Sequence, residues 1–253
     1  MSNLFGNLTT DGVEEAQDRL GGFRVLESGP YTGTIKAMYA GQASASKARS
    51  VTVMFAPDDG GAEYRETFWV TNKSDENFYT KDGKKHYLPG FTAVDDICQM
   101  VTGKGLAQQM AEDKVMNVYD PDQKKEVPKS VPMLVETLGK KVTLGIIKAT
   151  KNKQVKNSTT GAYEDTADSR DENFVDKVFH VPSNLTVVEA KRGVTTAAFY
   201  GSWVEVNKGK TQDRRTIKDG ASSQGGKSGR PNMPPKAGES NGTKTSSLFG
   251  KSI

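Results

Sequence analysis

The apolar residues of this chain are distributed unevenly, and this limits where a folded core can form. Of 87 apolar residues, 80 lie in residues 1–207 and only seven in residues 208–253. A segment so poor in apolar side chains cannot bury enough surface to offset the entropy lost on ordering. We therefore predict a folded body over residues 1–207 and a disordered tail over residues 208–253, with residues 219–245 as its linker.

The charged residues follow the same division. Ten basic and three acidic residues give the tail a formal charge of +7, whereas 25 basic and 28 acidic residues give the body −3. A basic segment attached to a mildly acidic body is typical of an interaction tail. The charge of the whole chain, +4, is too small to indicate a nucleic-acid binder by itself.

Several classes of protein do not fit the sequence. There is no run of about 18 apolar residues and no basic, apolar start typical of a signal peptide, so we expect no membrane contact and a cytoplasmic location. A single cysteine, Cys98, argues against a disulfide framework or a multi-cysteine zinc site. Two histidines, His86 and His180, give little basis for a His-rich metal site or a catalytic triad.

Alternating apolar and polar residues predict an antiparallel meander in the first half of the body. Residues 31–39, 50–55 and 64–70 have the two-residue period of half-buried strands. In the first of these strands, one face is expected to carry Tyr31, Gly33, Ile35, Ala37 and Tyr39. The Asp82–Gly83 pair within residues 77–90 then predicts a tight hairpin.

A helix is expected after this hairpin, capped by Thr92 and ended by Gly103. Its apolar side is formed by Val94, Ile97, Cys98 and Val101. The elements expected further along are a short helix over 106–113, strands over 114–119, 133–137, 141–149 and 175–181, and a polar loop over 151–173. Thr186 and Glu189 form the capping box of a short helix, and residues 195–207 form the last helix.

Two strand meanders separated by a helix indicate a mainly β fold with some helix (α+β). This layout matches an OB-fold-like antiparallel barrel, the five-stranded oligonucleotide-binding barrel, with short helices and a disordered C-terminal tail. A β-sandwich fits the number of strands nearly as well. The barrel is preferred because of where the aromatic residues and the lysines fall.

Residues 64–91 combine the two kinds of side chain that single-stranded nucleic acid requires. These 28 residues contain seven of the 20 aromatic residues, together with several cations. Aromatic rings stack on unpaired bases while cations follow the phosphates, without demanding a particular base sequence. The DNA-binding residues expected in this segment are Arg65, Trp69, Phe78, Tyr79, Lys81, Lys84, Lys85 and Tyr87.

A second basic stretch, residues 140–156, has six lysines and no acidic residue, so Lys148, Lys151 and Lys153 join the expected DNA-binding set. For both stretches a structural explanation stays open. Aromatic residues in strands usually belong to the core, and lysines are usually solvated. Phe78 and Tyr79 are adjacent in a strand, so they should point to opposite faces.

Catalytic patterns are weak. The carboxylates of residues 164–172 suggest a metal-dependent nuclease, but they fall in the expected polar loop without the glycine and spacing of a calcium loop. His86 has no acidic partner nearby in sequence, and the glycines around Lys104 follow a helix rather than a strand. We therefore expect no enzyme activity, no catalytic residue, no cofactor and no metal site.

The last eight residues differ from the rest of the tail. Leu248, Phe249 and Ile253 are large apolar residues at the end of a long polar segment, where no core is available to them. Such an end either has no role or is a short peptide that docks on a partner protein. The second interpretation assigns Ser247, Leu248, Phe249 and Lys251 to partner binding.

Short motifs along the chain resemble one family of phage proteins. They are Leu4-Phe5-Gly6-Asn7-Leu8, Asp18-Arg19-Leu20-Gly21-Gly22, Asn77-Phe78-Tyr79, Lys84-Lys85-His86-Tyr87-Leu88-Pro89-Gly90-Phe91, Asp96-Ile97-Cys98, Lys125-Glu126-Val127-Pro128, Leu138-Gly139-Lys140, Val175-Asp176-Lys177-Val178-Phe179 and Ser247-Leu248-Phe249-Gly250-Lys251. Together they are similar to the single-stranded DNA-binding proteins of short-tailed phages that carry a giant virion RNA polymerase. The resemblance covers about residues 1–210 and the last few residues.

The resemblance implies a barrel that coats single-stranded DNA during phage replication and recombination in the host cytoplasm. It also implies that the C-terminal tail contacts host RNA polymerase, activating transcription, or phage replication proteins. On this basis Tyr79 and its hairpin neighbours bind DNA, and Ser247 and Lys251 belong to the polymerase-contacting end. One difference is that this tail is basic, whereas well-known proteins of this type end in an acidic tail. Two other classes stay open: a phage structural or scaffolding protein tethered by its tail, and a carboxylate nuclease.

Overall fold

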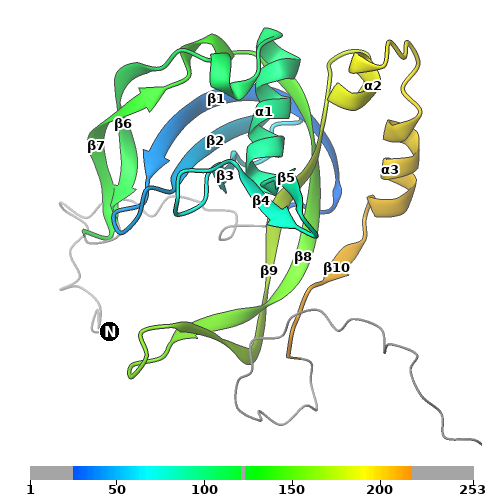
Figure 1. The fold of residues 1–253 in the computed structure, drawn as a ribbon. Coiled ribbons are helices and arrows are strands. Elements are labelled where there is room, and N and C mark those ends of the chain that lie inside the picture. The colour runs from blue at the N-terminus through cyan, green and yellow to red at the C-terminus, as the bar shows by residue number, and fades with distance from the viewer. Residues whose placement is uncertain (1–24, 121–122, 218–253) are drawn as a thin grey trace, which may run out of the picture. The chain divides into compact units, whose positions relative to one another are not determined.

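Antiparallel strands dominate the structure, a computed structural model that describes residues 25–120 and 123–217 (Figure 1). The strands are β1 (Gly29–Gln42), β2 (Arg49–Pro57), β3 (Tyr64–Trp69), β4 (Phe78–Lys81), β5 (Lys84–Tyr87), β6 (Glu112–Asp120), β7 (Lys125–Met133), β8 (Lys141–Lys156), β9 (Tyr163–Phe179) and β10 (Thr211–Asp213). The helices are α1 (Pro89–Thr102), α2 (Val187–Lys191) and α3 (Phe199–Asn207), with short 3-10 turns η1 (Leu106–Gln108) and η2 (Val135–Thr137). The mainly β fold with short helices is confirmed; the predicted disordered linker, residues 219–245, lies outside the described residues.

Five strands follow one another in the order β9-β8-β1-β2-β3, and each neighbouring pair is antiparallel. β3 and β9 are therefore the two edges of this sheet. The carboxylate of Glu66 on β3 links them, because its Oε2 accepts a hydrogen bond of 2.8 Å from the backbone N–H of Val175 on β9. The hydroxyl of Tyr64 donates to the same oxygen at 2.6 Å. In the described ranges this link is a side-chain contact rather than a backbone ladder, so barrel closure stays a prediction.

β1 has a packed layer on each of its faces. Ile35 and Met38 belong to the main core, whereas Ala37 and Tyr39 belong to a second cluster beneath the β6–β7 hairpin. A β-bulge between Ile35 and Ala37 shifts the register of β1 against β2 and produces this change of face. The prediction that Ile35, Ala37 and Tyr39 share one face is therefore wrong, because a strict two-residue period does not continue through a bulge.

Helix α1 lies against the main-core face of the sheet (Figure 1) and buries Val94, Ile97 and Cys98 completely. This apolar side and the end at Gly103, in the left-handed conformation with φ 74°, agree with the sequence prediction. The predicted start at Thr92 is wrong, because the helix begins at Pro89, where the ring presets the helical φ and no N–H is lost.

Two other predicted elements differ from the structure. Residues 106–113 do not form one helix: η1 ends at Gln108, and β6 starts at Glu112 because that segment pairs with β7. The strand predicted over 133–137 ends at Met133 and is followed by η2. Its buried Thr137 hydroxyl donates to the carbonyl of Leu134 at 2.7 Å, which stabilises the turn.

The predicted polar loop over residues 151–173 is also wrong. β8 and β9 continue as a long two-stranded arm, which extends away from the rest of the sheet in Figure 1. Most side chains of its outer half are exposed on both faces. A strand exposed on both faces has no buried side, so its sequence lacks the apolar alternation by which strands are recognised.

The C-terminal part of the body packs on β8 and β9 through α3. Trp203 is buried there and its indole N–H donates to the carboxylate of Asp176 at 2.7 Å. The last predicted helix starts only at Phe199, and the predicted Thr186–Glu189 capping box is confirmed. Past residue 207 the chain still belongs to the body, since β10 pairs in parallel with β8. None of the helices in the described ranges is long and apolar enough to cross a bilayer.

Glu66 provides the first test of this architecture. Replacing Glu66 by Ala leaves the donors of Tyr64 and Val175 without an acceptor, and we expect a loss of about 1–3 kcal/mol in the free energy of unfolding for each buried donor. Glu66→Gln retains an acceptor at this position, so its loss should be much smaller. Urea denaturation of the three proteins measures both differences.

The same residue predicts a pH dependence. Burial raises the pKa of the Glu66 carboxyl, so the folded protein binds this proton more tightly than the unfolded chain does. The neutral carboxyl of Glu66 stabilises the fold fully at a pH below its pKa in the unfolded chain. This stabilisation is lost as the pH rises through its pKa in the folded protein. Glu66→Gln should therefore become more stable relative to wild type as the pH rises above about 4, the usual pKa of a glutamate. A pH-independent difference would contradict this account.

Candidate nucleic-acid interface

The β4–β5 hairpin stands apart from the main sheet and exposes nearly all of its side chains. Within the described chain, β4 and β5 pair only with each other. Asp82 and Gly83 join them with φ values of 51° and 74°, which suit a two-residue hairpin turn. All four residues of β5 and the last three of β4 are exposed. The hairpin predicted from the Asp82–Gly83 pair is confirmed.

One face of the hairpin combines an aromatic pair with two cations. Tyr79 stacks on His86, with 5.5 Å between their ring centroids, and 44% of Tyr79 remains exposed. Lys81 and Lys84 lie opposite each other beside the turn. Because opposed residues in an antiparallel pair share a face, these four side chains lie on the same side of the hairpin.

The other face also combines aromatic rings with a cation. Lys85 places its ammonium nitrogen 4.1 Å from the centre of the Phe78 ring, close enough for a cation–π contact. Tyr87 packs beside Phe91, with 5.0 Å between centroids, yet 64% of Tyr87 is exposed. Phe78 and Tyr79 therefore point to opposite faces, as the sequence predicts, and neither face of the hairpin is covered by a core.

The aromatic residues of β3 divide between core and surface. Tyr64 and Phe68 are 7% and 6% exposed, so these two aromatic residues belong to the core rather than to a binding surface. Trp69 has 51% of its surface exposed. Arg65 is also on the exposed side of β3, where its guanidinium donates to the Tyr39 hydroxyl at 2.7 Å. Of the predicted site residues on β3, Trp69 is thus accessible for stacking, and Arg65 is held by Tyr39.

Local hydrogen bonds hold the base of the hairpin. The side-chain oxygen of Asn72 accepts from the backbone N–H groups of Ser74 and Glu76, at 2.8 and 3.0 Å. The backbone N–H of Leu88 donates to the carbonyl of Asn77 at 2.9 Å and ties the end of the hairpin to its start. Gly90 lets α1 approach β3, because a Cβ there would lie 2.4 Å from the Trp69 carbonyl oxygen. These contacts fix the hairpin relative to β3 and α1.

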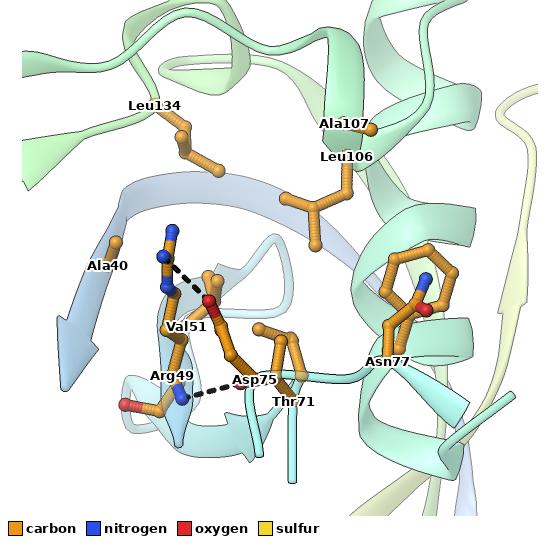
Figure 2. Close-up of a pocket in the computed structure, with 12 residues that line it drawn as sticks. Ala40, Arg49, Val51, Thr71, Asp75, Asn77, Leu106, Ala107 and Leu134 are labelled. Atoms are coloured by element: carbon orange, nitrogen blue, oxygen red, sulfur yellow. Dashed lines mark hydrogen bonds and ion pairs between the residues drawn. The ribbon is translucent and has the colours of Figure 1, made fainter. Parts of the chain in front are cut away.

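Three hollows, the first of which lies at this hairpin, share lining residues with one another. The first is lined by Asn77, Phe78, Lys85 and Tyr87. The second, about 400 Å³ in volume, also includes Asn77 and is lined mainly by apolar side chains of the sheet, α1 and η1 (Figure 2). The third shares Ala40 and Arg49 with the second and reaches the β6–β7 hairpin, where Lys129 lines it. Shared lining residues thus link the hollows in a series from one hairpin to the other.

Sequence analysis did not identify Arg49, Asn77 or Lys129 as candidate site residues. Arg49 is at the start of β2, and Asn77 lies just before β4. Lys129 lies in β7, which contains Pro128 and Pro132, so no strand was predicted there. Prolines are tolerated in β7 because it lies near a sheet edge, where it pairs with β6 and only briefly with β1. No local pattern in the sequence marks these three residues as neighbours, because they come from distant segments of the chain.

Lys148, Lys151 and Lys153 lie on β8, away from the hollows. Lys148 forms an ion pair of 2.9 Å with Glu27, and their hydrogen bond raises the pKa of the lysine. Lys151 pairs with Glu172. Among the residues that the structure describes, Lys153 alone of the three has no ion pair. Intramolecular pairs thus offset part of this cationic stretch, and its role in DNA binding stays a prediction.

The carboxylates considered for a nuclease lie on β9 rather than in a loop. Asp165 accepts hydrogen bonds from Thr216 at 2.5 Å and from Gln154 at 2.9 Å, and these bonds lower the pKa of its carboxyl. Asp171 accepts from the hydroxyl of Thr150 at 2.7 Å. In residues 25–120 and 123–217, no three His, Cys, Asp or Glu side chains are grouped so that they could hold a metal ion.

The predicted partner-binding residues Ser247, Leu248, Phe249 and Lys251 lie outside the described residues. Comparisons of the chain with protein-family models, with curated proteins and with solved structures give no match. The resemblance to phage single-stranded DNA-binding proteins therefore stays a prediction based on the motifs in the sequence.

The start of the C-terminal segment is fixed to the arm by Asn152, and this can be tested. Its side-chain oxygen accepts from the backbone N–H groups of Thr216 and Ile217, at 2.7 and 3.0 Å, and its amide donates to the carbonyls of Thr166 and Ile217. Asn152→Ala should release residues 216–217 because the Asn152 side-chain bonds that hold them are lost. We expect amide hydrogen exchange at Thr216 and Ile217 to accelerate by about tenfold or more. Exchange in β1 and β2 serves as the control, and unchanged protection at Thr216 and Ile217 would refute the anchoring role.

Proposed function

We propose that this protein is a non-enzymatic single-stranded DNA-binding protein that coats DNA through the β4–β5 hairpin. The observation that carries the proposal is that the hairpin exposes aromatic rings and lysines on both of its faces. A hairpin with no buried face gains little stability from large aromatic side chains, so a role outside folding accounts for them better. Trp69 at the end of β3 is a further ring accessible for stacking.

The chemistry of this surface favours single strands over duplex DNA. Stacking on Tyr79, Tyr87 or Trp69 requires bases whose faces are free, and in a duplex those faces are covered by neighbouring base pairs. Each stacked base contributes about 1–3 kcal/mol, while lysines neutralise phosphates without recognising a base. Binding is therefore expected to depend little on sequence and strongly on salt.

The proposal includes an OB-fold-like barrel as the scaffold. The strand order β9-β8-β1-β2-β3 and the bridge from Glu66 to Val175 between the two edges support it. A five-stranded barrel of this kind presents loops and hairpins on one side to an oligonucleotide. The β4–β5 hairpin, between β3 and α1 in the chain, would act as such a binding hairpin.

The biological role that we propose follows from the resemblance. It is the coating of single-stranded DNA in phage replication and recombination, in the cytoplasm of the host. Ser247, Leu248, Phe249 and Lys251 would contact host RNA polymerase, in late transcription activation, or phage replication proteins. The basic charge of the tail supports a partner surface that is acidic, since this tail cannot imitate DNA.

The hairpin tyrosines give the direct test of DNA binding. Tyr79→Ala and Tyr87→Ala should each weaken binding of labelled oligothymidine by about 1–3 kcal/mol, because one stacking platform is lost in each variant. Fluorescence anisotropy at a fixed, low salt concentration measures the dissociation constants. Thermal melting should show little change, because both rings are largely exposed.

Tyr119→Ala is the matched control for these variants. Tyr119 is 52% exposed but lies on β6. It points to the face of the β6–β7 hairpin opposite to Val118, which lines the third hollow. Its replacement should leave DNA affinity unchanged. Equal losses in all three variants, or no binding by the wild-type protein, would refute the proposed site. Absence of binding would favour the phage structural or scaffolding alternative.

Removal of residues 246–253 tests the tail. DNA affinity should remain nearly intact, because the hairpin and its cations stay in place, whereas a protein–protein contact should be lost. A pull-down from nuclease-treated host extract with full-length and shortened protein compares the partners, with RNA polymerase as the expected difference. Phe249→Ala in the full-length chain is the control for general effects of shortening. Identical partners for all three proteins would contradict a recruiting role for this peptide.

A further inference from the structure

An ion pair closes one side of the central hollow. The guanidinium of Arg49, at the start of β2, lies 2.8 Å from the carboxylate of Asp75. Figure 2 shows the two side chains meeting within the hollow, with Leu106 and Leu134 directed toward them from the opposite side. The side chain of Arg49 is 62% exposed, so a ligand in the hollow could reach it.

The turn that carries Asp75 holds the carboxylate in place. Asp75 has a φ of 65°, in the left-handed region that residues other than glycine rarely adopt. The surrounding turn stabilises it, since the N–H of Asp75 donates to the Asn72 carbonyl and the Asn72 side chain accepts from residues 74 and 76. The same turn leads directly into the β4–β5 hairpin. Asp75 is therefore a fixed partner for Arg49 rather than a side chain on a mobile loop.

Arg49 has the central position in the series of hollows. It lines both the second and the third hollow, whereas Asn77 lines the first and the second. In the part of the chain that the structure describes, the side-chain amide of Asn77 forms no hydrogen bond. A strand that follows the hollows away from the hairpin would thus meet an unpaired amide and then a guanidinium.

We infer that Arg49 is a phosphate-binding residue of the DNA path and that Asp75 competes with DNA for it. This inference rests on the proposed function. A strand stacked on the hairpin continues through the central hollow, where one base lies against apolar side chains beside Asn77. Its phosphate then replaces the Asp75 carboxylate on Arg49, and the strand passes into the third hollow toward Lys129.

The chemistry of this exchange is favourable. A guanidinium forms paired hydrogen bonds with phosphate as well as with a carboxylate, so Arg49 loses no bonding when the partner changes. An exposed ion pair adds little to stability, and breaking this one costs the fold little. Asp75 thus lowers the affinity for DNA and keeps Arg49 paired when no DNA is bound.

A double-mutant cycle on oligothymidine binding by the full-length protein tests the competition. Asp75→Asn should raise the affinity about three- to tenfold, because the competing charge is removed. Arg49→Gln should lower the affinity and reduce the slope of log K against log salt by about 0.7, the value for one phosphate on a single strand. In the Arg49→Gln background, Asp75→Asn should have almost no effect, since its target is gone.

Asp58→Asn is the matched control. Asp58 forms a similarly exposed pair with Lys141, 2.7 Å long, beyond the opposite end of β2. The Asp58→Asn substitution changes the net charge of the protein as Asp75→Asn does, so it measures the general effect of charge on DNA affinity. The expected result is a clearly larger gain for Asp75→Asn than for Asp58→Asn.

Two results would overturn the inference. One is an equal gain for Asp75→Asn and Asp58→Asn, and the other is a gain for Asp75→Asn that persists in the Arg49→Gln background. Either result combined with weakened binding by Tyr79→Ala would leave the proposed function in place and remove only the role of Arg49. Failure of the wild-type protein to bind oligothymidine would refute both. Thermal melts check that each variant is folded, and Arg49→Met, which is also uncharged, replaces Arg49→Gln if the latter is unstable.

Discussion

The bulge in β1 is the constraint on which the rest of the structure depends. By changing the face of β1 between Ile35 and Ala37, it allows one strand to contribute to two apolar clusters. The main cluster is covered by α1 and the second by the β6–β7 hairpin. Because these two covers lie on opposite sides of β1, they leave hollows at the ends of β1 and β2 rather than a flat sheet face.

The hairpin and the hollows illustrate two ways in which a small domain presents binding groups. On the hairpin, rings and cations are accessible because no core covers either side of β4 and β5 in the described chain. In the hollows, the groups are accessible because covering elements stop short of one another. The hairpin supplies stacking, which tolerates any base, and the hollows supply charge at fixed positions. Together they suit a ligand with a regular backbone and variable bases.

Much of the fold was predictable because buried strands and capped helices have local signals. The first three strands, the Asp82–Gly83 turn, the apolar side of α1 and the Thr186–Glu189 capping box were all recognised from sequence. The arm was missed because strands that are exposed on both faces have no apolar period, and β7 was missed because its prolines suggest a break. The bulge was missed because a single extra residue has no composition of its own.

The candidate site was predictable in part. Clustered rings and lysines in residues 64–91 pointed to the β4–β5 hairpin, since both groups lie close together in sequence. Tyr64 and Phe68 were separated from Trp69 only by the structure, because burial depends on which face of β3 meets the core. Arg49, Asn77 and Lys129 come from three distant segments. Their proximity is a product of the tertiary fold, which single-sequence periodicity does not contain.

The attachment of residues 209–217 to the body has a consequence for modular engineering. Ser28, which is 2% exposed, accepts a hydrogen bond from the N–H of Lys148 and donates one to the carbonyl of Lys210, so the crossing from α3 into β10 is locked to the sheet. A foreign tail fused at residue 207, where composition changes, would replace a strand and leave buried acceptors and donors unmatched. A junction after Ile217 would instead keep β10 and its hydrogen bonds to the sheet.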